Sequence, residues 1–241
     1  MSDELYSDYV RREPHPRNAV FIEKWHGKLL KLALEDEHSV KRILEVGPGH
    51  GYFAKHCETN GLIYEFCDTS PAVFNKMQKL GYSGHLGPLS DLLPNIGKFD
   101  MVYMSHVLEH SPSWIDARQL LDDCNKVLKN QGKLVIVSPD VLNWKHEFWN
   151  VDWSHGYPTS IRNITQLCSD LGFTNIEAKH HRNASTSVIV RAVFCILAKI
   201  PHRLIDRIIS PTRYQLGDGF TYSWKAVFGW RQIFIKASTR V

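Results

Sequence analysis

The sequence contains few cysteines and no pattern that would pair them. The five thiols are scattered, odd in number and form no C-x-x-C pair; they are Cys57, Cys67, Cys124, Cys168 and Cys195. Disulfide frameworks and zinc ribbons need closely spaced or paired thiols, so the sequence excludes both. This usage is typical of a reducing compartment, and we expect a cytoplasmic location.

Long apolar runs are also missing. The longest, residues 187–200, is interrupted by Arg191 and Lys199 and falls short of the roughly 20 apolar residues that span a bilayer. The N-terminal stretch MSDELYSDYVRREPHP is charged, unlike a secretory signal. The sequence therefore predicts neither a membrane-spanning helix nor a secreted protein.

The chain has no large excess of charge of either sign. Its 29 basic and 25 acidic residues give a formal charge of +4. A dedicated nucleic-acid binder carries a much larger basic excess, so we expect no nucleic-acid partner. Hydrophobic residues make up 43% of the 241 positions, enough for the core of one α/β domain.

Strand and helix patterns alternate from Lys41 onwards. Four short apolar runs alternate with helical stretches, as in βαβ units: Arg42–Val46, Leu62–Cys67, Asp100–Met104 and Lys133–Ser138. Further elements are expected at Ala19–Leu34 (helix), Thr159–Leu171 (helix), Phe173–Lys179 (strand) and Gln232–Ala237 (strand). The pattern predicts a doubly wound, mainly parallel, Rossmann-like sheet with helices on both faces.

A glycine-rich turn follows the first expected strand, in ILEVGPGHGYF. Glycines let a chain turn tightly and approach a ligand closely. A dinucleotide fingerprint would place its third glycine at Tyr52, whereas the spacing here is G-x-G-x-G. The residues Glu45, Gly47, Gly49 and Gly51 resemble motif I of class I S-adenosylmethionine (SAM)-dependent methyltransferases. Taken alone, the segment is equally typical of an ordinary glycine-rich turn.

The second expected strand ends at an acidic residue, in IYEFCDTSP. Asp68 can accept hydrogen bonds from both hydroxyls of a ribose, as the acid does in dinucleotide folds. The alternative is a structural role at a helix start, where Asp68 or Ser70 would serve as N-cap before Pro71. Both roles can hold together.

Two later segments also resemble this family. FDMVYMSHVLEHSPS is similar to its fourth-strand segment, and LLDDCNKVLKNQGKLVIVSPD to the stretch before its fifth strand. The second departs from the usual R-x-L-K-P-G-G, because Lys126 replaces the arginine and residues 130–132 read Asn-Gln-Gly. These changes affect a turn and leave the donor site untouched.

The resemblance implies a seven-stranded sheet with a reversed last strand, SAM as cofactor, and methyl transfer. Glu45 would act near the methionine ammonium and the glycines would line the donor, with Asp68, Thr69 and Ser105 completing the site. The expected organisation is an N-terminal arm and cap helix (1–40), a SAM-binding core (41–180), a basic amphipathic cover (181–230) and a final core strand (231–241).

Two motifs that the sequence lacks reduce the range of possible methyl acceptors. The fourth strand is not followed by the D/N-P-P-Y/F of amino methylases, and no Pro-Cys dipeptide is present for cytosine chemistry. A small molecule, sugar or lipid remains, including a lipid-linked sugar, and we expect transfer to a hydroxyl oxygen. The alternatives are an RNA or protein methyltransferase of the same fold and a non-catalytic SAM-binding module.

Histidines near the fourth strand are candidates for acid–base work. His106 follows that strand directly, and Glu109 and His110 come next. These three, with Asp152, could in principle ligate a metal, although Glu109-His110 is also typical of a structural helix start. The sequence does not require a metal, and we predict none, with Glu109 and His110 as the candidate ligands if one is bound.

An aromatic segment, NWKHEFWNVDWSHGYPTS, follows the fifth strand, where substrate loops belong. Asp152 and His155 are the predicted acceptor contacts, with His155 as a possible general base and His106 as a further catalytic candidate. The alternative is a packed lid in which His155 caps the helix at Thr159–Leu171.

A basic and apolar stretch occupies residues 185–230. Between 179 and 213 the only carboxylate is Asp206, among seven lysines and arginines. Such a segment can cover a substrate with its apolar face, or contact an anionic membrane surface through 185–213. The second reading would place the protein at the inner membrane face.

Overall fold

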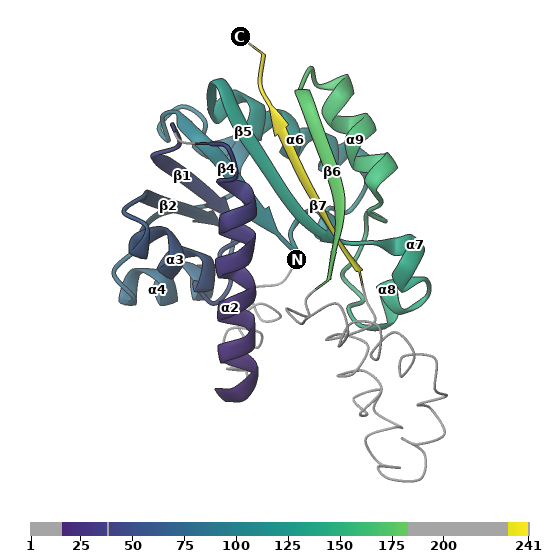
Figure 1. The fold of residues 1–241 in the computed structure, drawn as a ribbon, viewed down its shortest axis with the longest axis horizontal. Helices are drawn as coiled ribbons and strands as arrows, with labels where there is room; N and C mark the ends of the chain where they lie inside the picture. Colours follow the sequence, from purple (N-terminus) through teal and green to yellow (C-terminus); the bar gives the residue numbers. More distant parts are fainter. Residues whose placement is uncertain (1–15, 38, 183–230, 241) are drawn as a thin grey trace.

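The computed structural model describes residues 16–37, 39–182 and 231–240. Its seven strands form one sheet in the order β3-β2-β1-β4-β5-β7-β6. Their bounds are β1 Arg42–Val46, β2 Ile63–Asp68, β3 Ser83–Leu86, β4 Phe99–Ser105, β5 Leu128–Pro139, β6 Thr174–Arg182 and β7 Arg231–Ser238. Strands β1 to β5 pair in parallel, and β7 runs antiparallel to both β5 and β6. The predicted Rossmann-like sheet with a reversed last strand is confirmed (Figure 1).

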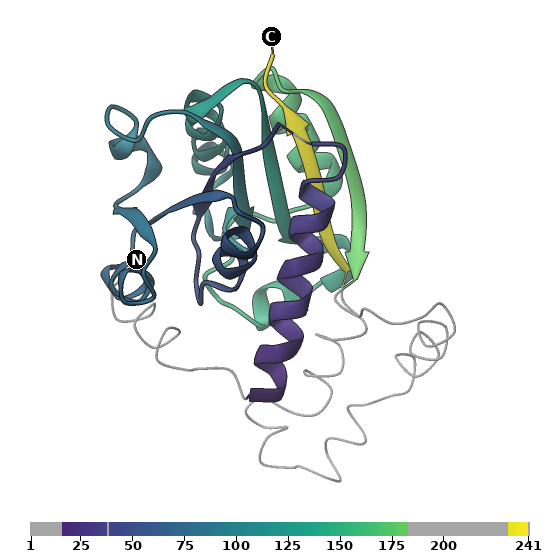
Figure 2. The same ribbon diagram turned by 60° about the vertical axis from the view of Figure 1, so that its left-hand side comes forward.

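Helices cover both faces of the sheet (Figures 1 and 2). One face carries α2 (Pro16–Ala33), α3 (Tyr52–Thr59) and α4 (Pro71–Lys79). The other carries α5 (Leu89–Leu92), α6 (Trp114–Val127) and α9 (Ile161–Asp170). Three short helices lie beyond the strand ends: η1 (Leu108–His110) after β4, and α7 (Val141–Trp144) and α8 (Glu147–Asn150) after β5.

The central strands are buried on both faces because their side chains alternate between two cores. Leu44, Val102 and Leu134 pack toward α6 and α9. Their neighbours Ile43 and Met101 pack toward α2 and α3. A parallel sheet covered on both sides has near-continuous apolar strands, which is why the sequence predicted these strands well.

Two strands differ from the sequence expectation. β3 was not predicted, since Ser83–Leu86 is short and lacks an apolar run. A Cβ on Gly84 would meet the Phe66 ring at 2.3 Å, so the strand lies too close to β2 for a larger residue there. β5 begins at Leu128 instead of Lys133 and continues through the expected turn, where Gln131 has a φ of 59°.

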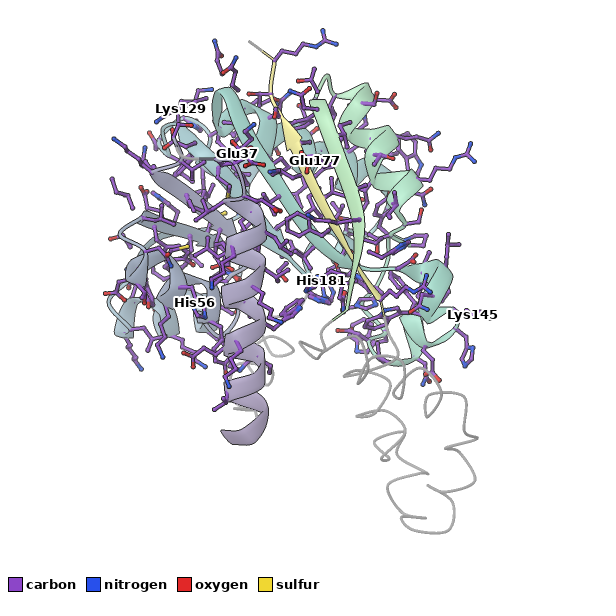
Figure 3. All side chains as sticks on the ribbon, viewed as in Figure 1. Glu37, His56, Lys129, Lys145, Glu177 and His181 are labelled. Carbon is purple, nitrogen blue, oxygen red and sulfur yellow. The ribbon has the colours of Figure 1, made fainter. Side chains whose placement is uncertain are left out.

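The N-terminal helix expected at Ala19–Leu34 is confirmed as α2, and ion pairs fasten the segment after it. Glu37 lies 3.0 Å from Lys133 on β5 and 3.5 Å from Lys236 on β7. Figure 3 shows Glu37 beside the C-terminal end of α2. These contacts hold α2 against the sheet, where it covers the candidate site described below.

Several expectations fall on residues that the structure does not describe. The arm at 1–15, nearly all of the basic cover (181–230) and the membrane-contact segment 185–213 lie outside the described residues. Within the described part of the chain, no helix is both long enough and apolar enough to cross a bilayer.

Candidate functional site

The loops that follow β1, β2, β4 and β5 meet at one edge of the sheet. These strands are parallel, so their carboxyl ends point the same way, toward the lower edge in Figure 1. Open α/β sheets bind ligands at this edge. The candidate residues named from the sequence lie along it in two groups, one after β1 and β2 and one after β4 and β5.

The glycine turn after β1 has a backbone that favours glycine at three positions. Gly47, Gly49 and Gly51 have φ angles of 71°, 53° and 79°, which side chains other than glycine rarely adopt. A Cβ on Gly47 would lie 2.6 Å from a methyl group of Val107, just beyond β4. The turn is therefore pressed against the end of the neighbouring strand, which connects the two groups of candidate residues.

Glu45 is buried at the carboxyl end of β1. The hydroxyl of Tyr64 donates to its Oε2 at 2.5 Å. Burial raises the pKa of Glu45 to about 8 and the Asp68 charge adds to the rise, while the Tyr64 hydrogen bond opposes it. Without a cation beside it, this carboxyl is protonated at neutral pH, and a cationic ligand would favour its ionisation. The sequence analysis did not find Tyr64, although Tyr64, Phe66 and Asp68 alternate along β2 in a way that places them on one face.

Asp68 ends β2 next to the glycine turn. Its Oδ1 accepts a hydrogen bond from the backbone N–H of Ser70 at 2.8 Å. Burial raises the pKa of Asp68 to about 6, against the backbone hydrogen bonds of Ser70 and Thr69. Thr69 is exposed beside it.

Ser70 occupies the N-cap position of α4, as the sequence predicted, but its side chain makes no capping hydrogen bond. Pro71 begins the helix at a position where its missing backbone N–H costs nothing. The turn is held by Asp68, which accepts from the backbone N–H of Ser70.

Helix α2 forms a wall over this edge. The Trp25 ring lies 6.0 Å from the His106 ring, and the His26 ring lies 6.0 Å from Tyr52 in the glycine turn. Burial lowers the pKa of His26 to about 3, with help from the charges of His106 and His56, so His26 is neutral. The expected cap helix thus contacts both groups of candidate residues.

His106 marks the end of β4, directly after half-buried Ser105. Its φ is 57°, an unusual conformation for a residue other than glycine, and its backbone N–H donates to Val137 at 2.9 Å. Its Nδ1 lies 3.1 Å from Oε1 of Glu109. Strained backbone of this kind clusters at functional sites.

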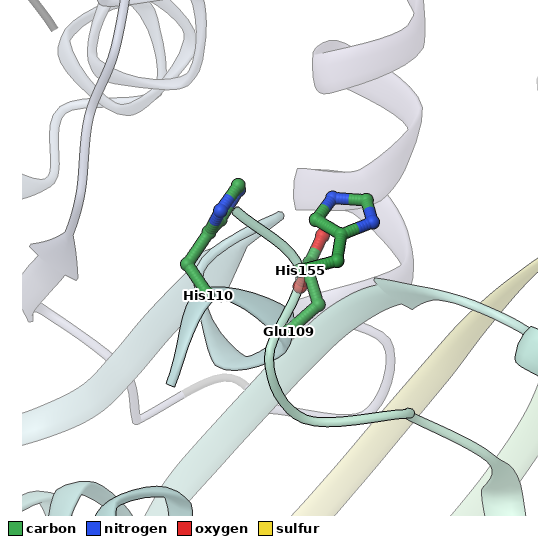
Figure 4. A group of neighbouring side chains, drawn as sticks. All are labelled: Glu109, His110 and His155. Atoms are coloured by element: carbon green, nitrogen blue, oxygen red, sulfur yellow. The ribbon is translucent and has the colours of Figure 1, made fainter. Parts of the chain in front are cut away.

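Glu109, His110 and His155 form a compact group beyond β4 and β5. One carboxylate oxygen and one nitrogen from each ring lie within 4.8 Å of one another. Figure 4 shows the Glu109 carboxylate between the two rings in this view. Glu109 and His155 come from segments 46 positions apart, on η1 and on the loop after α8. The sequence analysis grouped Glu109 and His110 with His106 and Asp152, and it did not predict that His155 lies beside them.

The charge state of this group follows from its surroundings. Burial alone would raise the pKa of Glu109, but the hydrogen bond and charge of His106 and the charge of His110 hold it below the usual value. Burial lowers the pKa of His110, against the charge of Glu109. The arrangement favours a buried carboxylate beside a neutral imidazole.

Hydrogen bonds fix which nitrogen of each histidine carries its proton. Nδ1 of His155 lies 2.5 Å from the backbone carbonyl of Phe148, which can only accept. Ser154 donates its hydroxyl proton to Asp152 at 2.6 Å and must therefore accept from Nδ1 of His110, 2.8 Å away. In the neutral form of either ring, the lone pair is therefore on Nε2.

The loop between α8 and α9 differs from one of the two readings made from the sequence, the one in which His155 caps a helix. Asp152 accepts a hydrogen bond from Ser154, which in turn contacts His110. His155 does not cap the following helix, because the hydroxyl of Ser160 accepts from the N–H of Asn163 there. The aromatic residues divide, with Phe148 fully buried and Trp153 70% exposed, so only part of the loop is a packed lid.

Comparisons with known proteins are consistent with this geometry. The profile of a family described as "Methyltransferase domain" matches residues 17–178. A comparison with curated proteins finds no match. Solved structures similar to the chain include a SAM-dependent methyltransferase from Archaeoglobus fulgidus, with 20% identity, a TM-score of 0.61, and coverage of 92% of this chain and 99% of that one.

Two further structures cover 98% of this chain at 15% identity. One is a Haloferax volcanii methyltransferase in complex with the Trm112 activator, covered over 98% of its length with a TM-score of 0.65. The other is a Haemonchus contortus phosphoethanolamine N-methyltransferase with phosphomonomethylethanolamine and S-adenosylhomocysteine, covered over 61% with a TM-score of 0.60. At such low identity these likenesses show the fold alone.

Proposed function

The chain belongs to the class I SAM-dependent methyltransferases, and from that premise we propose that it transfers the methyl group of SAM to a hydroxyl oxygen of a small organic acceptor. We choose oxygen as the accepting atom because His110 and His155 each present an Nε2 lone pair at the edge of the sheet where the donor site lies. A hydroxyl must lose a proton when it is methylated, and these are groups that can take one.

The residues after β1 and β2 fit the donor. Glu45 offers a buried carboxyl to the methionine ammonium, and Asp68 offers a second carboxyl to the ribose hydroxyls. The glycine turn leaves the space that a Cβ would fill, so a ligand can approach the backbone closely. Thr69 and Ser105 are the remaining proposed contacts, at the ends of β2 and β4.

SAM supplies a methyl group on a positively charged sulfur. In the proposed reaction an acceptor oxygen forms a bond to the methyl carbon while the carbon–sulfur bond breaks, and its electron pair stays on sulfur. The protein's part is to align the acceptor with the methyl group and to accept the hydroxyl proton. Nε2 of His155 is the proposed base, His106 contacts the acceptor at the end of β4, and Asp152 holds the orientation of His110 through Ser154.

The acceptor that we favour is a sugar, glycan or lipid-type intermediate, including a lipid-linked sugar. The aromatic loop, with Trp149 and Trp153 largely exposed beside the histidines, suits the face of a sugar or an apolar ring. We keep the cytoplasmic location and the membrane contact of 185–213 as parts of this proposal.

Transfer from methyl-labelled SAM tests the proposal. The purified full chain is incubated with a panel of hydroxyl acceptors and matched amines, and the methylated atom is identified by mass spectrometry. We expect label on oxygen, and at least a 100-fold loss of rate in His155→Asn with unchanged SAM affinity. Label on nitrogen alone would overturn the choice of acceptor atom. Transfer to RNA or protein would favour those alternatives, and SAM binding without transfer to any acceptor class would favour a non-catalytic module.

A further inference from the structure

We propose that Glu109, His110 and His155 bind one divalent transition-metal ion, of the class of zinc, manganese, iron or cobalt. The site consists of two imidazoles and one carboxylate, a donor set that holds such ions with open positions for other ligands. The binding of the ion does not depend on the proposed methyl transfer. The use of the ion in catalysis does depend on the proposed methyl transfer.

Burial and unused bonding capacity are the first observations. Glu109 has no exposed surface and His155 is 7% exposed. Oε1 of Glu109 forms an ion pair with Nδ1 of His106 at 3.1 Å, which uses one of the two lone pairs of this oxygen. The other oxygen of Glu109, Oε2, accepts from Ser138 at 2.9 Å, which fixes the carboxylate in place. A buried carboxylate needs compensating partners, and a cation can use the lone pair of Oε1 that His106 leaves available.

The orientation of both histidines is the second observation. Metal-binding histidines almost always donate their other N–H to a carbonyl or a carboxylate, which presents the remaining lone pair to the ion. His155 donates to the Phe148 carbonyl, and His110 donates to Ser154, which in turn donates to Asp152. Both lone pairs are thereby on Nε2, and both rings are fixed by partners outside the group.

Distance and charge agree with this assignment. One carboxylate oxygen and one nitrogen from each ring lie within 4.8 Å of one another, against about 3 to 3.5 Å for ligands around one ion with bonds near 2.1 Å. The ligand atoms would therefore approach one another by about 1 to 2 Å when they hold one ion. One carboxylate with two neutral imidazoles carries a single negative charge, which a divalent ion would offset. The two nitrogen donors favour transition metals over magnesium, which prefers oxygen.

Methyl transfer would use the ion as follows. A bound cation lowers the pKa of a hydroxyl that it binds, so the acceptor proton can leave to water at neutral pH. The oxygen then forms its bond to the methyl carbon as the carbon–sulfur bond breaks. In this arrangement His155 holds the ion instead of accepting the proton itself. Acceptors with an acidic hydroxyl or two neighbouring oxygens would suit the open positions.

Cobalt titration tests the site with a readout other than activity. The full chain is stripped with a chelator and titrated with Co²⁺, whose visible absorption reports on nitrogen and oxygen ligands, and zinc is titrated in competition by calorimetry. We expect one ion per chain with micromolar or tighter affinity. His110→Asn and His155→Asn should each weaken binding by about 100-fold, and Ser154→Ala by about 10-fold.

His146→Asn is the matched control, because His146 lies just before α8 with a 70% exposed side chain outside the group. Its cobalt affinity should equal that of the unchanged protein. SAM titrations on every variant establish that the donor half is folded. Absence of stoichiometric binding by the unchanged chain would overturn the proposal, as would equal affinities in His146→Asn and the two histidine-ligand variants. Neither result bears on SAM binding, so a failure here is distinct from failure of the methyl-transfer proposal.

Discussion

The two halves of the candidate site are built in different ways. The donor half, after β1 and β2, comes from two segments that are each continuous in sequence and that each carry a carboxylate near the end of the strand, at Glu45 and Asp68. The acceptor half, after β4 and β5, brings η1 together with a loop about 45 positions later. The donor half is therefore visible as a motif, whereas the acceptor half depends on how the chain folds back. Substitutions should separate the two.

Gly47→Ala should have the largest effect, because it affects the contact between the halves. The new Cβ would lie 2.6 Å from Val107 at a φ of 71°, combining overpacking with backbone strain. We expect a loss of about 2 to 5 kcal/mol in the free energy of unfolding, together with weaker SAM binding. Gly61→Ala has a similar φ of 69° and no atom within 4 Å, so it should cost only about 1 to 2 kcal/mol. Equal losses in urea titrations would contradict the close contact.

Asp68→Asn should weaken SAM binding by about 10- to 100-fold, because a charged hydrogen-bond acceptor for the ribose hydroxyls is lost. The amide keeps an oxygen to accept from the N–H of Ser70, so the turn should persist. Calorimetric titration measures the change. Asp91→Asn, on exposed α5, is the control and should bind SAM normally. If both variants bound equally well, Asp68 would have no part in the donor site.

The pKa of Glu45 makes donor binding depend on pH. Its value of about 8 means that the empty protein holds a proton there at neutral pH, which a cationic donor would expel. SAM affinity should therefore rise by about tenfold from pH 6 to pH 7, with release of close to one proton. Calorimetry in buffers of different ionisation enthalpy counts that proton.

Tyr64→Phe removes the hydrogen bond that lowers the pKa of Glu45, so the affinity rise should shift to higher pH. The same linkage acts on the protein without ligand. The folded chain holds this proton up to a pKa of about 8, whereas an unfolded Glu ionises near 4.5, so the contribution of Glu45 to stability falls as pH rises through this interval. A pH-independent SAM affinity would show that Glu45 does not face the cation.

Ser160→Ala should have the smallest effect and only on the acceptor side. It removes the hydroxyl that caps α9, which costs about 1 kcal/mol of unfolding free energy. His155→Asn should leave the helix cap intact, since His155 bonds to Phe148 instead. Thermal unfolding measures the loss in Ser160→Ala, and hydrogen exchange of the Asn163 amide, which the Ser160 hydroxyl accepts from, decides between the two residues. Faster exchange of that amide in His155→Asn but not in Ser160→Ala would restore the capping role that the sequence suggested for His155.

The sequence predicted the fold and the donor half from local patterns. Buried parallel strands appear in the sequence as apolar runs, and the glycine turn has a fixed spacing. Each of these features can therefore be recognised within one short, continuous stretch of sequence. β3 was missed because the Phe66 ring occupies the space where a side chain at position 84 would lie, so this position must be glycine. A strand of sequence SGHL therefore shows no run of apolar residues from which it could be predicted. Tyr64 was missed because its role depends on the register between β1 and β2.

The acceptor half could be predicted only residue by residue. His106, Glu109, His110, Asp152 and His155 were all candidates, but the order of their contacts depends on Ser154, which carries no sequence signal of its own. Asp152 contacts His110 only through Ser154. His155 lies beside His110 and Glu109 because the loop after α8 returns over η1. Such a meeting is set by tertiary structure.

The most direct test is calorimetric titration of SAM into the unchanged chain and into a His110→Asn, His155→Asn double variant. The unchanged chain should bind one SAM with micromolar affinity, about −8 kcal/mol, and the double variant should match it within about twofold. That result would establish a donor half that works independently of the acceptor histidines. Absence of binding by the folded, unchanged chain, or an equal loss of SAM affinity and transfer in the double variant, would contradict the division of the site into two halves.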